Sequence, residues 1–269
     1  MRQIIINADD FGKSPGRNHA IHDSFTQGLI LSAGLIVTGK HLPEAVELMK
    51  KGGYVDKIHL HVNLSANLMN EDSDDIPLTK EMRLDSSFSN NGKFKEYKGL
   101  PKKITFIRKW RIVYREIVAQ YTKFIEVTEG KGDSSHIDFH LWYNLTWPVS
   151  VALKFFTRRY KIKSVRYIGV HHSCMEKYKK LRKYPIISRN PHVKSYPATN
   201  IDYYLSKQSF FERVPIIELY CHPNYKDGVF LDDSPSYLKH ERQPMLVQIQ
   251  MLKDHGVSEF ISWKDIKNN

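Results

Sequence analysis

Cysteine is scarce in this sequence, and long hydrophobic runs are absent. Only Cys174 and Cys221 occur among the 269 residues, so a disulfide framework is excluded, and neither belongs to a Cys-x-x-Cys pair typical of zinc or redox sites. No run of about 18 apolar residues exists, which excludes a membrane-spanning helix. The first residues enter a strand pattern without an apolar signal segment. We therefore expect a soluble, cytoplasmic protein.

The composition and the order of predicted elements favour one large α/β domain. With 41% hydrophobic residues, a chain of this length can bury the core of an α/β barrel. Alternating strands and helices are predicted in the first part of the chain, with strands at 4–7, 29–38 and 57–64 and helices at 15–27 and 41–51. We predict a single domain over residues 1–269 with a (β/α) barrel-like fold, as an irregular or incomplete TIM-type barrel.

The middle and the end of the chain follow this alternation less clearly. Residues 65–103 are polar, without regular apolar spacing, and we interpret them as a lid or insertion. From 104 to 127 apolar residues recur at steps of three and four, which predicts a long amphipathic helix whose aromatic residues belong to the core. Later elements are predicted as strands at 135–141, 164–170, 215–221 and 259–262 and a helix at 238–255.

Positive charge is in excess and is concentrated in one stretch. The formal net charge is +12, and residues 154–194 contain 13 Lys or Arg and only one acid, Glu176, with tyrosines interleaved. Such a pattern can contact phosphates and stack on bases. However, no nucleic-acid-binding module is recognisable, and basic stretches are most often solvated surfaces. We favour a solvated face and do not expect nucleic acid as a partner.

Two adjacent acids, Asp9 and Asp10, follow the apolar run of the first predicted strand. Parallel α/β folds place their chemistry at such strand ends, and neighbouring carboxylates repel each other unless a cation or a shared proton relieves them. A metal site with a proton-transfer partner is one interpretation. A helix cap is the other, but Ser14 and Pro15 already provide the cap and first turn of the next helix.

Histidines alternate with apolar residues on two predicted strands. Period-two geometry places His59, His61 and Asn63 on one face of the first strand, and His136, Asp138 and His140 on one face of the other. Each histidine taken singly is typical of a structural residue. Together with the Asp9 and Asp10 pair, the two strands offer one carboxylate and two imidazoles, which suits zinc or another divalent ion at a catalytic site. Spacing alone leaves open which histidine of each strand is the ligand.

His222 ends a further apolar strand and precedes Pro223. A residue before proline is held in an extended conformation, so His222 should point from the strand end into a loop. It is a candidate general acid, although structural histidines also occur at such places.

Four segments, in this order and spacing, resemble the YdjC-like carbohydrate deacetylases. They are Asn7-Ala8-Asp9-Asp10-Phe11-Gly12, His61-Val62-Asn63-Leu64, His136-Ile137-Asp138-Phe139-His140 and Glu218-Leu219-Tyr220-Cys221-His222-Pro223. The likeness extends to Asn18, Ala20, Ile21 and Gly28, and to Glu116 and Gln120, and covers nearly the whole chain. The sequence departs from the family after His140, where Trp142 and Asn144 replace further alternating histidines.

This resemblance implies a barrel-like enzyme that removes acetyl groups from N-acetylated sugars of the chitooligosaccharide type, as a homodimer. It implies one divalent ion, magnesium or zinc, with Asp10, His61 and His140 as ligands, Asp9 as the base and His222 as the general acid. The departure at Trp142 and Asn144 concerns substrate preference, and Trp142 and Tyr143 are candidates for stacking on sugar rings.

Two other interpretations remain. The first is a non-catalytic protein on the same fold that binds a sugar, a regulatory partner or nucleic acid, which the intact set of candidate residues argues against. The second is another metal-dependent hydrolase such as a phosphoesterase, which would usually need more carboxylates or a second metal cluster.

Overall fold

Strand β1 (Gln3–Phe11) lies inside a parallel sheet, paired with β2 on one side and β9 on the other. The structure is a computed structural model that describes residues 3–66, 75–95, 109–140, 147–166, 193–197, 216–232, 251–255 and 259–266, with only the backbone for 193–197. The strand order is β7-β6-β3-β2-β1-β9-β8, and β12 pairs with the beginning of β1. The remaining strands of this sheet are β2 (Ser32–Leu35), β3 (Ile58–Val62), β6 (Asp133–Phe139), β7 (Ser164–Val165), β8 (Val193–Pro197), β9 (Ile216–Cys221) and β12 (Glu259–Phe260).

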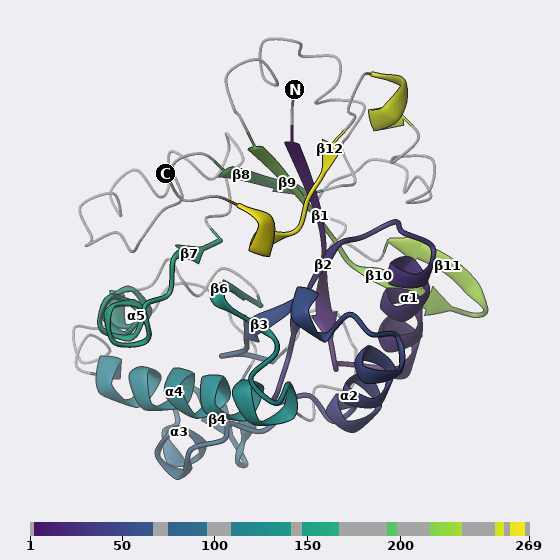
Figure 1. Cartoon of the computed structure of the whole chain (residues 1–269). Helices are drawn as coiled ribbons and strands as arrows, with labels where there is room; N and C mark the ends of the chain where they lie inside the picture. The colour runs from purple at the N-terminus through teal and green to yellow at the C-terminus, as the bar shows by residue number, and fades with distance from the viewer. Residues whose placement is uncertain are drawn as a thin grey trace, which may run out of the picture.

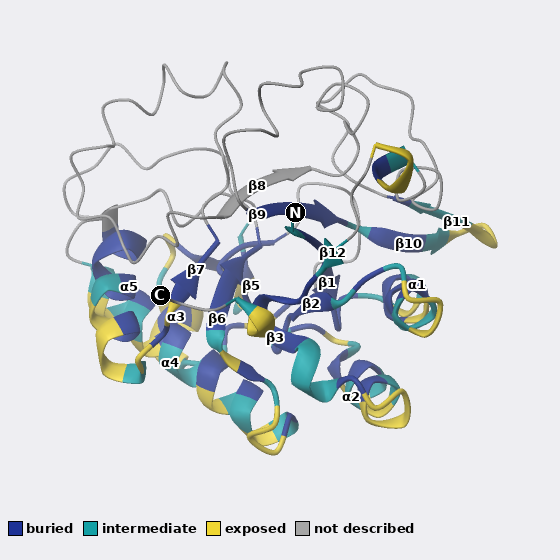
Figure 2. Ribbon diagram, turned by 45° about the horizontal axis from the view of Figure 1, so that its top comes forward, coloured by how far each residue is buried: buried dark blue, intermediate teal, exposed yellow. Residues whose placement is uncertain are grey.

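Helices lie along the outer face of the curled sheet (Figures 1 and 2). They are α1 (Pro15–Thr26), α2 (Leu42–Lys51), α4 (Trp110–Val127) and α5 (Trp147–Tyr160). The result is an α/β domain with a half-barrel sheet, an incomplete TIM-like barrel, which confirms the predicted fold class. Among the described residues, no helix combines the length and apolar content needed to cross a bilayer.

Alternation along β1 separates the core from the inner face. Ile4, Ile6 and Ala8 belong to the large cluster between sheet and helices, whereas Ile5 packs in a separate cluster with Trp263. Because side chains of a strand alternate between its faces, Asn7 and Asp9 follow Ile5 onto the inner face. The apolar residues of β1 thus anchor the sheet while its polar residues face the barrel interior.

The first helix begins and ends where the sequence predicts. Ser14 accepts a hydrogen bond from the backbone N–H of Arg17, and Pro15 occupies the first turn. Gly28 follows the helix with a φ of +68°, a conformation that glycine adopts without strain. Neither Asp9 nor Asp10 caps this helix, so the structure leaves both acids for another role.

The second predicted strand, 29–38, is too long. β2 has only four residues, because the register of β1 against β2 shifts between Ala8 and Phe11 and the chain leaves the regular pairing after Leu35. It then turns at Gly39, which packs so closely on the carbonyl of Gly12 that a side chain would collide with it. The turn leads directly into α2.

Residues 75–95, part of the polar segment 65–103, contain regular secondary structure although their sequence shows no apolar period. They contain α3 (Lys80–Leu84) and a hairpin of β4 (Ser89–Asn90) and β5 (Lys93–Phe94), elements too short to show a period in the sequence. Glu116 on α4 holds this segment by accepting hydrogen bonds from the backbone N–H groups of Leu78 and Thr79. Residues 67–74 and 96–108 lie outside the described ranges, and the role of the segment as a lid stays a prediction.

Later strands follow the predicted order. β6 begins two residues earlier than predicted, β9 and β12 are shorter, and residues 167–170 of the predicted strand 164–170 lie outside the described ranges. A hairpin of β10 (Pro223–Lys226) and β11 (Val229–Asp232), not predicted from the sequence, follows β9 and packs on α1, where Tyr225 Oη donates to Asp23 at 2.7 Å. Short 3-10 turns occupy Val55–Lys57 and Trp263–Asp265. Of the predicted helix at 238–255, residues 238–250 lie outside the described ranges, and 251–254 are helical.

Candidate active site

The carboxyl ends of β1, β3 and β6 bring the predicted site residues together. His61 pairs in register with Asp138 of the neighbouring strand, and the backbone N–H of His140 donates to the carbonyl of Val62 at 3.0 Å. Strand alternation alone would turn Asp10 toward the helices. Its φ of +70° lies in the left-handed region, which aspartate tolerates better than most residues, and turns its carboxylate to the inner face.

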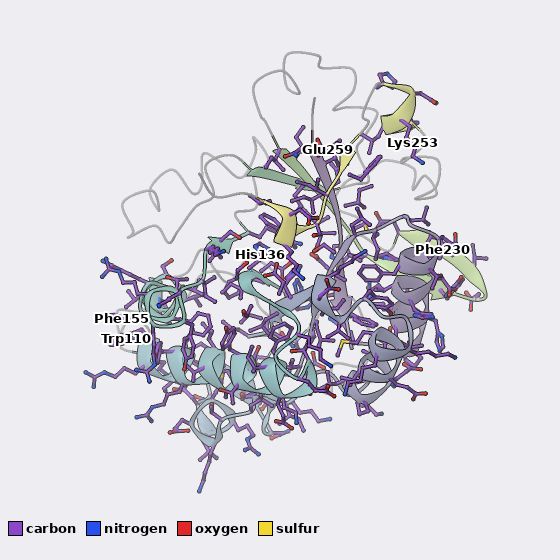
Figure 3. The ribbon with its side chains drawn as sticks, in the orientation of Figure 1. Trp110, His136, Phe155, Phe230, Lys253 and Glu259 are labelled. Carbon is purple, nitrogen blue, oxygen red and sulfur yellow. The ribbon has the colours of Figure 1, made fainter. Side chains whose placement is uncertain are left out.

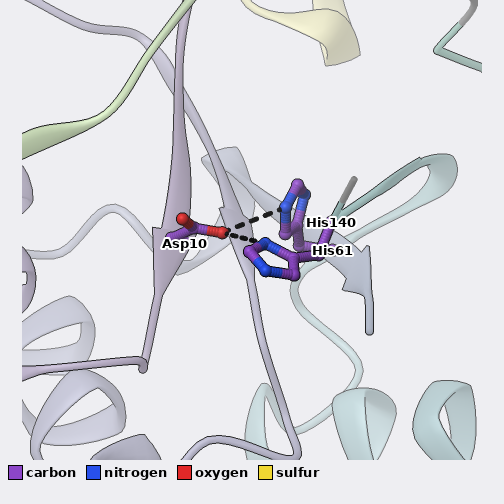
Figure 4. A group of neighbouring side chains, drawn as sticks. All are labelled: Asp10, His61 and His140. Carbon is purple, nitrogen blue, oxygen red and sulfur yellow. Dashed lines mark hydrogen bonds and ion pairs between the residues drawn. The ribbon is translucent and has the colours of Figure 1, made fainter. Parts of the chain in front are cut away.

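Asp10, His61 and His140 form a buried triad (Figure 4). Oδ1 of Asp10 lies 2.7 Å from Nδ1 of His140 and 3.3 Å from Nε2 of His61. One donor atom from each side chain lies within 4.8 Å of the other two. A carboxylate oxygen with two imidazole nitrogens is a donor set that divalent ions accept.

Burial and neighbouring charges shift the pKa values of the triad, and for Asp10 and His140 they favour protonation states that suit a bound cation. Burial opposes a charge on His61, but Asp138, Asp9 and Asp10 raise its pKa to about 10. Burial and Lys13 lower the pKa of His140 to about 4, which keeps this imidazole neutral. Burial alone would raise the pKa of Asp10, yet His140, Lys13 and His61 hold it well below its ordinary value. A divalent ion would therefore meet an ionised carboxylate and a neutral imidazole, and would displace a proton from His61.

The whole centre has an excess of negative charge. The carboxylates that contact the triad or Arg166 are Asp9, Asp10, Asp138 and Glu218, and the permanent cations that contact them or the triad are Lys13 and Arg166, all buried. Four formal negative charges thus face two positive ones, and buried charges need compensation. One divalent cation would balance the difference, so the residues present fit a single bound ion.

Neighbouring groups fix the orientation of both imidazoles. Oδ1 of Asp138 lies 2.6 Å from Nδ1 of His61, which leaves Nε2 directed toward Asp10. Nε2 of His140 lies 3.1 Å from Nζ of Lys13. A carboxylate partner such as Asp138 usually sets the orientation of a metal-ligating histidine. The Lys13 ammonium, in contrast, can only donate a hydrogen bond to Nε2 of His140.

Gly34 on β2 leaves the space in which His61 meets Asp138. A Cβ at this position would lie 3.0 Å from Nδ1 of His61 and 3.1 Å from Oδ1 of Asp138. We expect Gly34→Ala to weaken divalent-ion binding by about 10- to 100-fold, as loss of an outer partner of a ligand usually does, measured by calorimetric titration. Gly130→Ala is the control for strain away from the triad: its Cβ would meet no atom within 4 Å, but its φ of +71° strains an alanine, so it should lower the melting temperature and leave the ion affinity unchanged. Wild-type affinity in Gly34→Ala would show that the sheet relaxes without disturbing His61.

Two other groups of histidines and acids have ligand-like spacing, His59 with His136 and Asp138, and Asp9 with His61 and Asp138. The guanidinium of Arg166 makes both groups unfavourable as metal sites. Its Nη2 lies 2.7 Å from Oδ2 of Asp138, and its two terminal nitrogens bind both oxygens of Asp9. A guanidinium at this distance repels a metal cation. The Asp10, His61 and His140 triad has a cation beside it too, since Nζ of Lys13 lies 3.1 Å from Nε2 of His140. Within the described ranges, however, no guanidinium contacts the carboxylate of Asp10, so this triad is the better cation site.

His59 and His136 have structural surroundings. Nε2 of His59 lies 2.9 Å from Oδ2 of Asp138. His136, which is labelled in Figure 3, is buried. Its ring stacks on that of Trp263, with ring centroids 3.6 Å apart and planes at 10°. Burial and His59 lower the pKa of His136 well below its ordinary value, so it is a neutral packed ring.

Asp9, the predicted base, lies beside the triad with three polar neighbours. Arg166 donates to both oxygens, at 2.6 and 2.8 Å, and Nδ2 of Asn7 donates to Oδ1 at 2.9 Å. Nε2 of His222 is 3.9 Å from Oδ2, beyond hydrogen-bond distance. The structure therefore places the predicted base and general acid at the same strand ends as the triad, with His222 the more exposed of the two at 14%.

Sequence reasoning missed Arg166, Lys13 and Glu218. The interpretation of the basic stretch as a solvated face is wrong for Arg166, which is 2% exposed. Its position immediately after the short strand β7 was an available signal, because functional residues of parallel sheets follow the strand ends. Lys13 similarly follows β1.

Some predicted features lie outside the described residues. They are Cys174, Trp142, Tyr143, Asn144 and most of the basic stretch, residues 167–192. Cys221 is buried, and burial raises the pKa of its thiol well above the ordinary value, which is typical of an unreactive structural cysteine.

A curled parallel sheet with outer helices and a buried carboxylate and imidazole centre defines an α/β half-barrel protein with a candidate metal site. The chain belongs to the YdjC-like protein family, whose family model matches residues 3–262. This confirms the resemblance seen in the sequence.

Two relatives and one solved structure illustrate the similarity. The chain is 25% identical to carbohydrate deacetylase 1 of Listeria innocua serovar 6a over 278 residues, 98% of this chain and 97% of the relative. It is 32% identical to carbohydrate deacetylase 2 of that organism over 155 residues, 55% of this chain and 53% of the relative. A crystal structure from Enterococcus faecalis V583, provisionally described as a cellobiose-phosphate cleavage protein, has a TM-score of 0.62 at 21% identity, covering 84% of this chain and 82% of the other. This last likeness concerns the fold alone.

Proposed function

We propose that this protein is a metal-dependent hydrolase that removes acetyl groups from N-acetylated sugars or chitooligosaccharides. The observation that carries the proposal is the convergence of Asp10, His61 and His140 beside Asp9 at the strand ends. Its substrate class is supported by the relatives named carbohydrate deacetylase, one of which matches nearly the full chain.

Hydrolysis of an acetamido group needs an activated water, a polarised carbonyl and a proton for the leaving nitrogen. A divalent ion held by Asp10, His61 and His140 would supply Lewis-acid polarisation and lower the pKa of the attacking water. In this proposal Asp9 accepts the proton of that water. His222 donates a proton to the amine nitrogen as the C–N bond breaks, which releases acetate and the free amino sugar.

The finer features of the proposal follow the family resemblance. The ion is magnesium or zinc, since one carboxylate and two imidazoles suit zinc while a site with open positions also accepts hydrated magnesium. We further propose one domain over residues 1–269, with the segment 65–103 as its lid, and a homodimer as the assembled form.

The direct test is acetate release by the purified protein. After removal of bound metal with a chelator, the protein should release acetate from N-acetylglucosamine or chitooligosaccharides only when magnesium or zinc is restored. Metal content measured in parallel should be one ion per chain. Metal binding without acetate release from any member of the panel would refute the hydrolase and favour a sugar-binding role, and release of phosphate from phosphorylated sugars would instead indicate a phosphoesterase.

A further inference from the structure

Arg166 is a buried cation at the centre of three carboxylates. It directly follows β7 and its backbone N–H donates to the carbonyl of Ile137 at 3.0 Å, which continues the sheet pairing. Its side chain is 2% exposed. A guanidinium loses much of its hydration when it is buried, and this costs free energy. Ion pairs and hydrogen bonds with carboxylates can offset that cost, and the contacts of Arg166 are of this kind.

The contact with Asp9 is bidentate. Nη1 donates to Oδ2 at 2.6 Å and Nη2 to Oδ1 at 2.8 Å, while Asn7 also donates to Oδ1. Two parallel hydrogen bonds from the terminal nitrogens of a planar guanidinium, here called the fork, fix both the position and the plane of a carboxylate. A single hydrogen bond leaves the carboxylate free to rotate. Asp9 is thereby held in one orientation.

Arg166 is itself held from its other side. Nε donates to Oε1 of Glu218 at 2.8 Å, and the same oxygen accepts a hydrogen bond from Nε1 of Trp263 at 3.1 Å. The guanidinium also lies 5.3 Å from the centroid of the Tyr220 ring. These contacts, from β9 and from the turn after β12, leave the fork little freedom to move.

The same guanidinium also contacts Asp138, the carboxylate that orients His61 of the triad. Nη2 lies 2.7 Å from Oδ2 of Asp138, whose Oδ1 holds Nδ1 of His61 at 2.6 Å. One cation therefore touches both the carboxylate of the proposed base and the carboxylate that orients a proposed metal ligand.

We propose that Arg166 is the positioning residue of this active site, fixing the carboxylate plane of Asp9 relative to the metal triad, with Glu218 as the anchor of its guanidinium. The inference rests on the proposed hydrolase function. Arg166 acts through Asp9 and does not touch the substrate. Misplacement of a reacting group by about 1 Å can cost about 10²-fold in rate, so loss of the bidentate contact should lower kcat far more than it changes substrate binding.

The test compares Arg166→Gln and Arg166→Lys with Arg158→Ala, an exposed member of the same basic stretch. Both Arg166 variants should lose about 10²-fold in kcat measured at saturating divalent ion, with KM changed by less than about threefold because the substrate surface keeps its residues. Saturating ion removes the contribution of any change in ion affinity that is transmitted through Asp138 and His61. Arg158→Ala should match the wild type. Lysine retains the charge without the planar pair of donors, so wild-type kcat in Arg166→Lys would overturn the proposal. A loss of kcat that saturating divalent ion restores would reduce Arg166 to a structural support of the triad.

A second variant keeps the proposal testable if Arg166→Gln does not fold. Glu218→Gln keeps Arg166 in place but replaces its charged anchor by an amide, and should lower kcat by about tenfold, the weakening expected when a charged hydrogen bond becomes neutral. Unchanged kcat in Glu218→Gln would contradict the positioning role. A wild-type protein that releases no acetate would instead refute the proposed function, and an active wild type with equally active variants would refute this inference alone.

Discussion

Alanine in place of His140 should lower divalent-ion affinity by more than about 10²-fold, whereas alanine in place of His136 should leave it nearly unchanged. Both histidines lie on the inner face of β6 or directly after it, four positions apart, so they form a matched pair. His140 lies 2.7 Å from Asp10, while His136 belongs to the group whose shared acid, Asp138, already binds the Arg166 guanidinium. Calorimetric titration with zinc and with magnesium measures both affinities, and acetate release should follow them.

The opposite pattern of affinities in the two variants would contradict the assignment of the metal to Asp10, His61 and His140. Lost binding in His136→Ala with retained binding in His140→Ala would assign the ion to His59, His136 and Asp138, against the electrostatic argument from Arg166. Melting temperatures of both variants serve as the control, because both side chains are buried and each change leaves a cavity. Only a loss of affinity in a folded variant counts as evidence about ligation.

Asparagine in place of Asp9 should keep the metal and lower deacetylation by about 10²-fold or more, because the amide cannot accept the proton of water. The change also has a structural cost. Arg166 donates to both oxygens of Asp9, and an asparagine offers one acceptor in their place. Leaving a buried donor without its acceptor costs about 1–3 kcal/mol, so a lower melting temperature should accompany the loss of activity.

Asp56→Asn is the matched control, since Asp56 is a surface acid, 48% exposed, that pairs with Lys264. It should retain full activity and stability within about 0.5 kcal/mol. If Asp9→Asn instead loses the metal while remaining folded, Asp9 is a ligand and the two adjacent acids have been assigned in the wrong order.

The sequence by itself was sufficient to predict which residues share a face of each strand. Period-two alternation placed His59 with His61, and His136 with His140, on a polar face, and the structure shows these faces inside the curl of the sheet. Helix α1 was predictable for the same reason, because the capping by Ser14 and the turn at Gly28 depend on neighbours in sequence. The family resemblance rested on similarly local segments.

Other features depended on contacts between distant segments. Alternation would turn Asp10 away from the histidines, and only the left-handed backbone and the register shift of β1 against β2 bring it to them. The choice between His61 and His59, or between His140 and His136, likewise rests on which of them the Asp10 carboxylate reaches.

Arg166 shows this division most clearly. In the sequence it is one of 13 basic residues between 154 and 194, a composition typical of a solvated surface. In the fold it is buried against Asp9, 157 positions away, and Glu218, 52 positions away. Local composition determines the average behaviour of a charged segment, but the environment of one side chain depends on which strand ends the sheet brings together. The sequence therefore determined the polar strand faces and the acidic pair, and the tertiary structure alone decided which cation holds them, because burial and charge pairing are properties of the folded neighbourhood.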